Sequence, residues 1–491
     1  MSSKNRKYFD PCHMPCAFPV PIPGPTSIDF DHKKRCLSLV QNPSFEAGLA
    51  EWITSDNLST IGEAPFEGNQ VARMPEGVAH MFQDVYLPFK TNCSLFLSFN
   101  VFGVDPVPNL TVEILWLNAH HQAIATGLRM FIPEGTITGT SNARITYFDI
   151  TDFRPEGAAF ARILFSKREG TFIDIDQVIL TPVLTPNLVQ NASFEVGLAS
   201  WNSNTFIPNF RKPLQGAADV IAAQSGTLFQ DVSIADQPPN SPYLLSFGAF
   251  SEGLLFLTIQ VQWLDTANNI IGSPGLELTI PNETLKNQES YLTYLDITDR
   301  APLGAVTARI LFSPDIGPDS GSTLKVDKVI LVRVTSTNLV SNPSFEDDLN
   351  DWTVVNTSLI TEADVYEGDA AALVNNFGGV TFQDVPIANA ADHCFLFNCG
   401  IRIFRFGMGG AVSNVLVKVL WLDNSGREIG EGLSLVCFGQ NDVLQFPKWL
   451  IYTGITEPAP LNTAAARIQF TKLFFPNGFL EIDKVVLGRL V

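Results

Sequence analysis

The sequence predicts an all-β protein in which three tandem β-sandwich domains follow an extended N-terminal arm. A block of about 150 residues occurs three times along the chain. Within each block, short runs of β-branched and aromatic residues end at Asn, Asp or Gly turn residues, as β-strands do. No segment combines the apolar spacing of a helix with caps over three turns, so sandwiches of about eight or more strands are favoured.

Residues 1–37 form the predicted arm. Its Pro-rich stretch AFPVPIPGP (17–25) favours an extended conformation and cannot build a core, so we expect the arm to seek a partner surface. Six basic against three acidic residues give it a net charge of +3. Its thiols, Cys12, Cys16 and Cys36, have no counterparts in the repeats. Three interpretations stay open: disulfides between subunits, a zinc site that also uses His13, and unpaired thiols.

The repeat opens with SLVQNPSFEAGLAEW (38–52), which returns as NLVQNASFEVGLASW (187–201) and NLVSNPSFEDDLNDW (338–352). From Asn42 to Asn191 is 149 residues, and from Asn191 to Asn342 is 151. Four landmarks follow in the same order each time: FQDV from Phe82, Phe229 and Phe382; WLN or WLD from Trp116, Trp263 and Trp421; ARI from Ala161, Ala308 and Ala466; and D-x-V from Asp176, Asp327 and Asp483. The predicted domains are therefore residues 38–184, 185–335 and 336–491, which suits a chain of 491 residues.

The strands are predicted from runs such as TVEILWLN, TIQVQWLD and LVKVLWLD, one in each domain. The segment WLDNSGREIG (421–430) predicts a strand, a Gly-containing turn and the next strand. Only residues 181–187 and 332–338 join the last strand of one domain to the opening motif of the next. Connections this short, with little Gly, predict a semi-rigid rod or a compact row of domains.

Each domain has a Glu in its opening motif and an Asp in its closing motif, at the first and last strands, which commonly meet in a sandwich. The expected pairs are Glu46 with Asp176, Glu195 with Asp327, and Glu346 with Asp483. Paired carboxylates, backbone carbonyls and a Gly turn suit Ca²⁺, which prefers several hard oxygen ligands. Glu67 and Glu367, each followed by Gly, would add a ligand, whereas the second domain has Gln215. The two hypotheses are a structural calcium and carboxylates that cap strand ends or turn amides.

The repeated tryptophans fall into two classes. Trp52, Trp201 and Trp352 end the opening motif, and Trp116, Trp263 and Trp421 lie in a strand with apolar residues on the same face. This spacing favours a core position. The alternative is an aromatic platform on which sugar rings stack.

Two further patterns are interpreted as structural. The segments Asp149-Ile-Thr-Asp152 and Asp296-Ile-Thr-Asp299 are acidic, but the third copy begins with Gly454, so a turn or strand-end role is favoured. His120 and His121 have no counterparts and are expected in a surface loop. Because the chain has no G-x-S-x-G, no P-loop and no zincin helix, the sequence predicts no enzyme and no catalytic residue.

Four cysteines lie within the domains. Aligning FNC (397–399) with LSF (97–99) puts Cys399 at a core position. Cys93 and Cys394 fall near one another in the alignment, at the start of a strand, and are further candidates for disulfides between subunits. The fourth is Cys437. Since the total of 7 is odd, at least one thiol must be free or bonded between chains.

The charge excludes two classes of partner. With 50 acidic against 31 basic residues and a net charge of −19, the chain repels nucleic acid and anionic membrane surfaces. No apolar stretch follows Met1 to Lys7 as in a signal peptide, and no run of about 18 apolar residues predicts a membrane span. We expect a protein that is made in the cytosol and does not span a membrane.

The opening N-x-S-F-E-x-x-L-x-x-W and closing D-x-V motifs resemble carbohydrate-binding modules that share the galactose-binding-like jelly roll. This resemblance implies a jelly-roll β-sandwich with a structural calcium near the Glu and Asp residues above. The run VQWLDTANNIIGSPGLELTIPNETL (261–285), followed by ARILFS and DKVIL, is similar to the domain that precedes collagen-like repeats in bacterial exosporium-type spore-surface proteins. The similarity covers nearly all of residues 38–491, but the chain lacks the Gly-X-Y tract of those proteins.

The second resemblance implies a protein assembled on the spore surface from the mother-cell cytosol. The first hypothesis is a structural, self-assembling subunit of a spore surface layer, exosporium or fibre (an appendage or filament). In it the arm docks on an acidic neighbour and inter-subunit disulfides lock the polymer. Its partners would be other copies of the chain, other spore-surface proteins or glycans. The alternative is a lectin-like carbohydrate-binding adhesion protein, which requires exposed aromatic residues on a sandwich face. A third hypothesis is a component of a parasporal inclusion or toxin.

Overall fold

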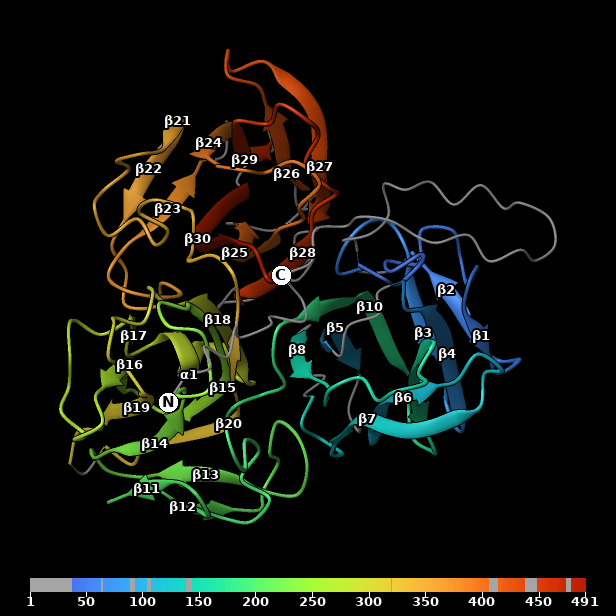
Figure 1. Cartoon of the computed structure of the whole chain (residues 1–491), viewed down its shortest axis with the longest axis horizontal. Helices are drawn as coiled ribbons and strands as arrows, with labels where there is room; N and C mark the ends of the chain where they lie inside the picture. The colour runs from blue at the N-terminus through green and yellow to red at the C-terminus, as the bar shows by residue number, and fades with distance from the viewer. Residues whose placement is uncertain are drawn as a thin grey trace, which may run out of the picture.

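The computed structural model describes residues 38–491 except 63–64, 89–92, 104–106, 138–143, 319, 376, 406–413, 438–447 and 474–477. The predictions for Cys12, Cys16 and Cys36 lie outside these residues. The predicted all-β fold is confirmed: the strands form six five-stranded antiparallel sheets, and the described part of the chain has one helix, α1 (Thr284–Gln288) (Figure 1). No helix among the described residues is long and apolar enough to cross a membrane.

The first module contains two sheets, which we call outer and inner. The outer sheet has the order β1-β4-β9-β6-β7, and its strands are β1 (Ile53–Thr54), β4 (Ala79–Tyr86), β9 (Phe160–Lys167), β6 (Leu110–Leu117) and β7 (Ala123–Ile132). The inner sheet has the order β2-β3-β10-β5-β8, and its strands are β2 (Ser59–Ile61), β3 (Val71–Met74), β10 (Ile173–Val183), β5 (Ser94–Gly103) and β8 (Ile145–Ile150).

The second module repeats this topology. Its outer sheet, in order, contains β11 (Asn202–Ser203), β14 (Leu228–Ser233), β19 (Thr307–Asp315), β16 (Phe256–Leu264) and β17 (Leu276–Ile280). Its inner sheet, in order, contains β12 (Ile207–Asn209), β13 (Asp219–Ala222), β20 (Thr323–Arg333), β15 (Tyr243–Glu252) and β18 (Leu292–Ile297).

The third module is built in the same way. Its outer sheet, in order, contains β21 (Thr353–Val355), β24 (Gly379–Pro386), β29 (Ala465–Lys472), β26 (Val415–Leu422) and β27 (Glu428–Cys437). Its inner sheet, in order, contains β22 (Thr357–Ile360), β23 (Ala371–Val374), β30 (Gly478–Gly488), β25 (Leu396–Arg405) and β28 (Leu450–Ile455).

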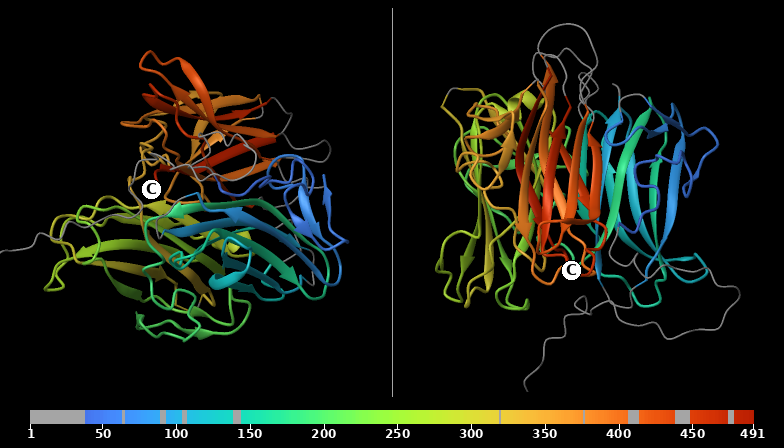
Figure 2. Two further views of the ribbon diagram at one scale, coloured as in Figure 1. Left: turned by 45° about the vertical axis from the view of Figure 1, so that its right-hand side comes forward. Right: turned by 90° about the horizontal axis from the view of Figure 1, so that it is seen from above.

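The two kinds of sheet differ in burial because of how the modules pack. Along β9, buried residues alternate with half-buried ones, as expected for a sheet with one face on the core and one toward solvent. All six residues of β8, β18 and β28 are buried, and β8 contacts both β18 and β28. The inner sheets therefore face one another at the centre of the molecule, and the outer sheets face outward (Figures 1 and 2).

The three modules form a closed ring. The turn after the first strands of each module donates a backbone hydrogen bond to the preceding module: Gly216 N to Phe131 O (2.7 Å) and Gly368 N to Thr279 O (2.7 Å). Gly68 N of the first module donates to Val436 O of the third (3.1 Å) and so closes the cycle. The prediction of a rod or row was wrong, because linker length limits the distance between modules but not the angle between them.

The x residue of each D-x-V motif also bridges modules. Gln177, Lys328 and Lys484 have φ near +50° (49°, 51° and 48°), each at the point where the register of its inner sheet shifts. The Lys328 ammonium pairs with Asp149 (2.6 Å), and that of Lys484 pairs with Asp296 (2.7 Å). The acidic segments thus end strands, as predicted, but they also hold the ring.

At the interface between the first and third modules, neither the lysine nor the aspartate of this ion pair is present. Gln177 donates to the carbonyl oxygen of Thr453 (2.7 Å), and the neighbouring Gly454 takes the place of the carboxylate. A buried cation without a partner costs several kcal/mol, so the neutral Gln and the missing Asp are consistent with each other.

Candidate functional site on the outer sheet of the first module

All six repeated tryptophans belong to the core. Trp52, Trp201 and Trp352 are 6%, 6% and 7% exposed, and Trp116, Trp263 and Trp421 are 1% exposed each. The indole N–H of Trp52 donates to the carbonyl of Asn42 (3.2 Å), which closes the opening motif on itself, and the same bond recurs in the other modules. The core prediction is confirmed, and these tryptophans do not form a sugar platform.

The paired carboxylates bind backbone amides. Glu46 accepts hydrogen bonds from the N–H groups of Asn69 (2.6 Å) and Gln70 (2.8 Å), and Asp176 accepts from those of Phe66 (2.8 Å) and Glu67 (3.0 Å). One turn is therefore held from both sides. Equivalent bonds involve Glu195, Asp327, Glu346 and Asp483. Burial raises the pKa of Asp176, Asp327 and Asp483 well above the usual range of an aspartate.

This donor set does not fit a calcium ion by itself. The carboxylate oxygens already accept N–H bonds, and the described residues contain no group of three His, Cys, Asp or Glu side chains that could hold a metal ion. Glu67 does not turn toward Glu46 as a shared ligand but accepts a bond from Val436 N (3.1 Å) of the third module. Calcium at these residues stays a prediction, which a titration tests below.

The FQDV and ARI landmarks meet on every outer sheet. Arg162 makes two hydrogen bonds to Asp84 (2.6 and 2.8 Å), and its guanidinium lies 4.2 Å from the ring centre of Phe82. We call this arrangement the Arg–Asp–Phe cluster. It recurs with Arg309, Asp231 and Phe229, and with Arg467, Asp384 and Phe382. A bidentate pair of this kind is rigid and leaves a flat, partly exposed surface beside the ring.

Among the described residues, only those of the first module extend this cluster with further rings. The His121 ring stacks on Phe160 with centres 4.2 Å apart, and its Nδ1 lies 2.7 Å from a carboxylate oxygen of Asp84. Tyr86, which is 61% exposed, meets the edge of Phe160 at 5.6 Å. Burial acts to raise the pKa of Asp84, but hydrogen bonds from Arg162 and His121 outweigh it and hold that pKa below the usual range.

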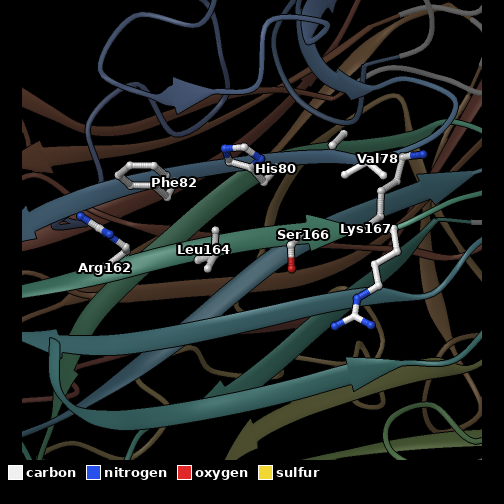
Figure 3. Close-up of a pocket in the computed structure, with 9 residues that line it drawn as sticks. Val78, His80, Phe82, Arg162, Leu164, Ser166 and Lys167 are labelled. Carbon is white, nitrogen blue, oxygen red and sulfur yellow. The ribbon is translucent and has the colours of Figure 1, made fainter.

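Two hollows flank the cluster. One, of about 430 Å³, is lined by Val78, Ala79, His80, Phe82, Arg162, Leu164, Ser166, Lys167 and Arg168 (Figure 3). The other, of about 410 Å³, is lined by Gln41, Glu51, Ile53, Gln83, Asp84, Val85 and His121. Since Arg162 lines the first hollow and Asp84 the second, their ion pair lies between them. Figure 3 shows Phe82 and His80 on one strand, beside Arg162, Leu164 and Ser166 on the next.

This site was not predicted from the sequence. His121 lies in a surface loop, as predicted, but its contacts with Phe160 and Asp84 were not expected. The strand register aligns Tyr86 with Ser233 and Pro386, and Phe160 with Thr307 and Ala465. Aromatic residues present in one repeat and absent from the others were the available signal.

The described cysteines lie away from this sheet face. Cys399 is buried, as predicted, and so is Cys437, and burial raises the pKa of both thiols well above the usual range. Cys394 is a free, half-buried thiol, and Cys93 is buried. The prediction of a disulfide between subunits at Cys93 was wrong, because Cys93 is disulfide-bonded within the chain, whereas such a bond at Cys394 stays a prediction.

No protein-family model and no curated protein sequence matches the chain. Similar solved structures include the tandem CBM22-1-CBM22-2 domain of Paenibacillus barcinonensis Xyn10C (12% identity, 60% of this chain and 96% of that one, TM-score 0.26). Others are TmCBM61 in complex with β-1,4-galactotriose (17%, 30% and 99%, TM-score 0.23) and the C-terminal family 22 module of Clostridium thermocellum Xyn10B (15%, 30% and 91%, TM-score 0.24). These structural neighbours are carbohydrate-binding modules with the jelly-roll fold. At these TM-scores they assign no ligand to this chain.

Proposed function

We propose that the protein binds carbohydrate through the outer sheet of its first module. The observation that carries this proposal is the group of partly exposed rings, Phe82, Tyr86, His121 and Phe160, around the Arg162–Asp84 pair. The apolar face of a sugar ring stacks on aromatic rings, and fixed charged groups hydrogen-bond its hydroxyls. Hollows on both sides of the pair leave room for more than one sugar unit.

The other two modules serve as internal comparisons. They keep the Arg–Asp–Phe cluster, but they replace the remaining rings with small or aliphatic residues. Because the Arg–Asp–Phe cluster joins neighbouring strands in all three outer sheets, the cluster by itself does not indicate a ligand. The extra rings of the first module are what favour a ligand there. Asp84 is held by the Arg162 guanidinium and the His121 ring and is not a free acid or base, so the proposal is binding without catalysis.

The test uses the full chain in a polysaccharide retardation gel and on a glycan array. We expect Phe160→Ala to abolish retardation while leaving the melting temperature within about 3 °C of wild type, because Phe160 is half-buried on a surface strand. Thr307→Ala, the same position in the second module, is the matched control and should bind like the wild type. If the wild type binds no glycan, or if both variants bind equally well, the proposal fails.

A structural subunit of a spore surface layer, exosporium or fibre remains the second candidate. The observation in its favour is the closed ring, which presents three outer sheets on one compact body. Polymerisation would rest on residues 1–37, with other spore-surface proteins as further partners. Electron microscopy of the full chain and of a variant lacking residues 1–37, with and without reductant, tests it. Assemblies that need neither the arm nor disulfides would contradict it.

A further inference from the structure

We propose that the hollow beside Phe82 selects glycans that carry acidic groups, such as uronate or sulfated sugars. The proposal rests on the carbohydrate-binding function above and names the class of ligand. Its basis is an excess of basic side chains at one place on an acidic protein. Such an excess is informative because the chain as a whole has a net charge of −19.

The hollow is lined by four basic residues and by no acidic one: His80, Arg162, Lys167 and Arg168. The charge of Arg162 is matched by its ion-pair partner Asp84, which lines the other hollow. The Lys167 ammonium is bound by backbone carbonyls, with Gly77 O and Thr171 O both at 2.8 Å, so its charge is not neutralised by a bonded carboxylate. Arg168 is exposed, and so is His80.

Lys167 is unusual because a charged lysine is buried there, which costs solvation free energy. Its side chain is 2% exposed, although an ammonium group normally stays in water. Burial lowers its pKa, and the neighbouring charge of Glu76 partly opposes this effect. Three carbonyls hold the ammonium in place, so Lys167 brings a fixed positive charge to the lining of the hollow.

The other modules lack some of these groups. The strand register places Pro314 and Asp315 of the second module, and Lys472 and Leu473 of the third, at the positions of Lys167 and Arg168. At the position of His80 they have Thr227 and Val380. The third module keeps the lysine as Lys472, but His80 and Arg168 have no basic equivalent, so these two groups coincide with the extra aromatic rings of the first module.

The net charge of the protein does not prevent this selection. At physiological ionic strength, exposed charges are screened beyond about 8 Å, so a bound anion responds mainly to the groups that line the hollow. Guanidinium groups hydrogen-bond carboxylate and sulfate oxygens in pairs, and a ring beside them stacks the sugar that carries the acid.

The experiment compares polygalacturonate with its fully methyl-esterified form, using the full chain in affinity gels. We expect the acid polymer to bind at least about tenfold more tightly, and Arg168→Ala to remove most of this preference. Arg129→Ala removes an exposed arginine from β7 of the same sheet and should change nothing. A parallel arm with κ-carrageenan, which carries sulfate esters but no carboxylate, separates sulfate from carboxylate recognition.

Two outcomes overturn the inference. One is equal binding of the acid and ester polymers with Phe160→Ala still abolishing both, in which case the carbohydrate function stands and charge selection falls. The other is equally tight binding of polyglutamate, which would show simple ion exchange. If no polysaccharide binds at all, the proposed function fails together with this inference.

Discussion

His121 adopts a backbone conformation that the other two modules give to Asn268 and Gly426. The φ angles at these equivalent turn positions are 58°, 63° and 76°. Left-handed φ costs an L-residue about 1 kcal/mol, least for Gly and Asn. The first module has a histidine at this position, and its ring stacks on Phe160 and pairs with Asp84. Local strain of this kind is typical of residues that serve a ligand site.

We therefore expect His121→Gly to weaken carbohydrate binding while stability stays equal or rises by at most about 1 kcal/mol. Retardation gels and thermal melts measure the two effects on the same sample. Asn268→Gly, in the second module, is the control for the backbone effect alone. Unchanged retardation by His121→Gly would show that the imidazole takes no part in binding.

Glu46 tests the two roles proposed for the carboxylates. Because it accepts two backbone N–H bonds, Glu46→Ala should destabilise the protein by about 1–3 kcal/mol. If the only role of the Glu46 carboxylate is to accept these backbone hydrogen bonds, the melting temperature of the wild type will be the same in calcium and in EDTA. A melting temperature that rises with calcium, and no longer does so in Glu46→Ala, would establish the metal site instead.

At the scale of the element, the sequence predicted most of the strands. The strand, turn and strand expected from WLDNSGREIG are β26 and β27, and FQDV, ARI and D-x-V lie in β4, β9 and β10 and in their equivalents. Periodicity and turn residues suffice for this because both are local. The helix α1 was not predicted, since it has only five residues, too few for an apolar period.

A contact between a glycine on one strand and a tryptophan on its neighbour could not be predicted from the sequence. Gly127, Gly275 and Gly432 lie against the indoles of Trp116, Trp263 and Trp421, where a Cβ atom would come within 2.4, 2.4 and 2.7 Å of ring atoms. These glycines let the tryptophan lie flat under the outer sheet. The pairing depends on the register between two strands, which no local pattern reports.

Gly275→Ala should therefore destabilise the second module by about 1–3 kcal/mol through overpacking. Thermal or urea unfolding of the full chain measures it. Gly304→Ala is a useful comparison, because no atom lies within 4 Å of its added Cβ and any cost there comes from the positive φ of 95° alone. A Gly275→Ala variant as stable as the wild type would show that the indole can move.

At the scale of the whole molecule, the ring was not predictable from one copy of the repeat. Its interfaces are made by residues that are far apart in sequence, such as Glu67 and Val436. The substitutions at the interface between the first and third modules, Gln177 and Gly454, were visible as departures from the repeat. Their meaning depends on which modules touch, and that follows only from the three-dimensional packing.

The buried pair of Lys328 and Asp149 allows a test of the ring. Lys328→Met leaves the Asp149 carboxylate buried without its cation, and this should cost about 3–5 kcal/mol. Adding Asp149→Asn should recover a large part of the loss, because the uncompensated charge is then gone. Urea unfolding of the two variants measures the difference. If the single variant loses no stability, the first and second modules do not pack as described.

The buried carboxylates also set how stability depends on pH. Burial raises the pKa of Glu481 to about 7, although Arg402 opposes this, while Glu362 and Asp364 add to it. In the unfolded chain its pKa is near 4.5. Below pH 4.5 the carboxyl is protonated in both states, and its contribution to stability is fully present. Between pH 4.5 and about 7 the unfolded state loses the proton first, so stability falls as pH rises.

Asp149, Asp176, Asp296, Asp327 and Asp483 act in the same direction, since burial raises their pKa values too, whereas Asp84 acts in the opposite one. We expect a higher melting temperature at about pH 5 than at about pH 8, and a smaller difference in Glu481→Gln. The amide oxygen of the glutamine still accepts a bond from Arg402, so the fold is kept while the titration is removed. A melting temperature that is highest at about pH 8 would mean that the buried ion pairs outweigh desolvation.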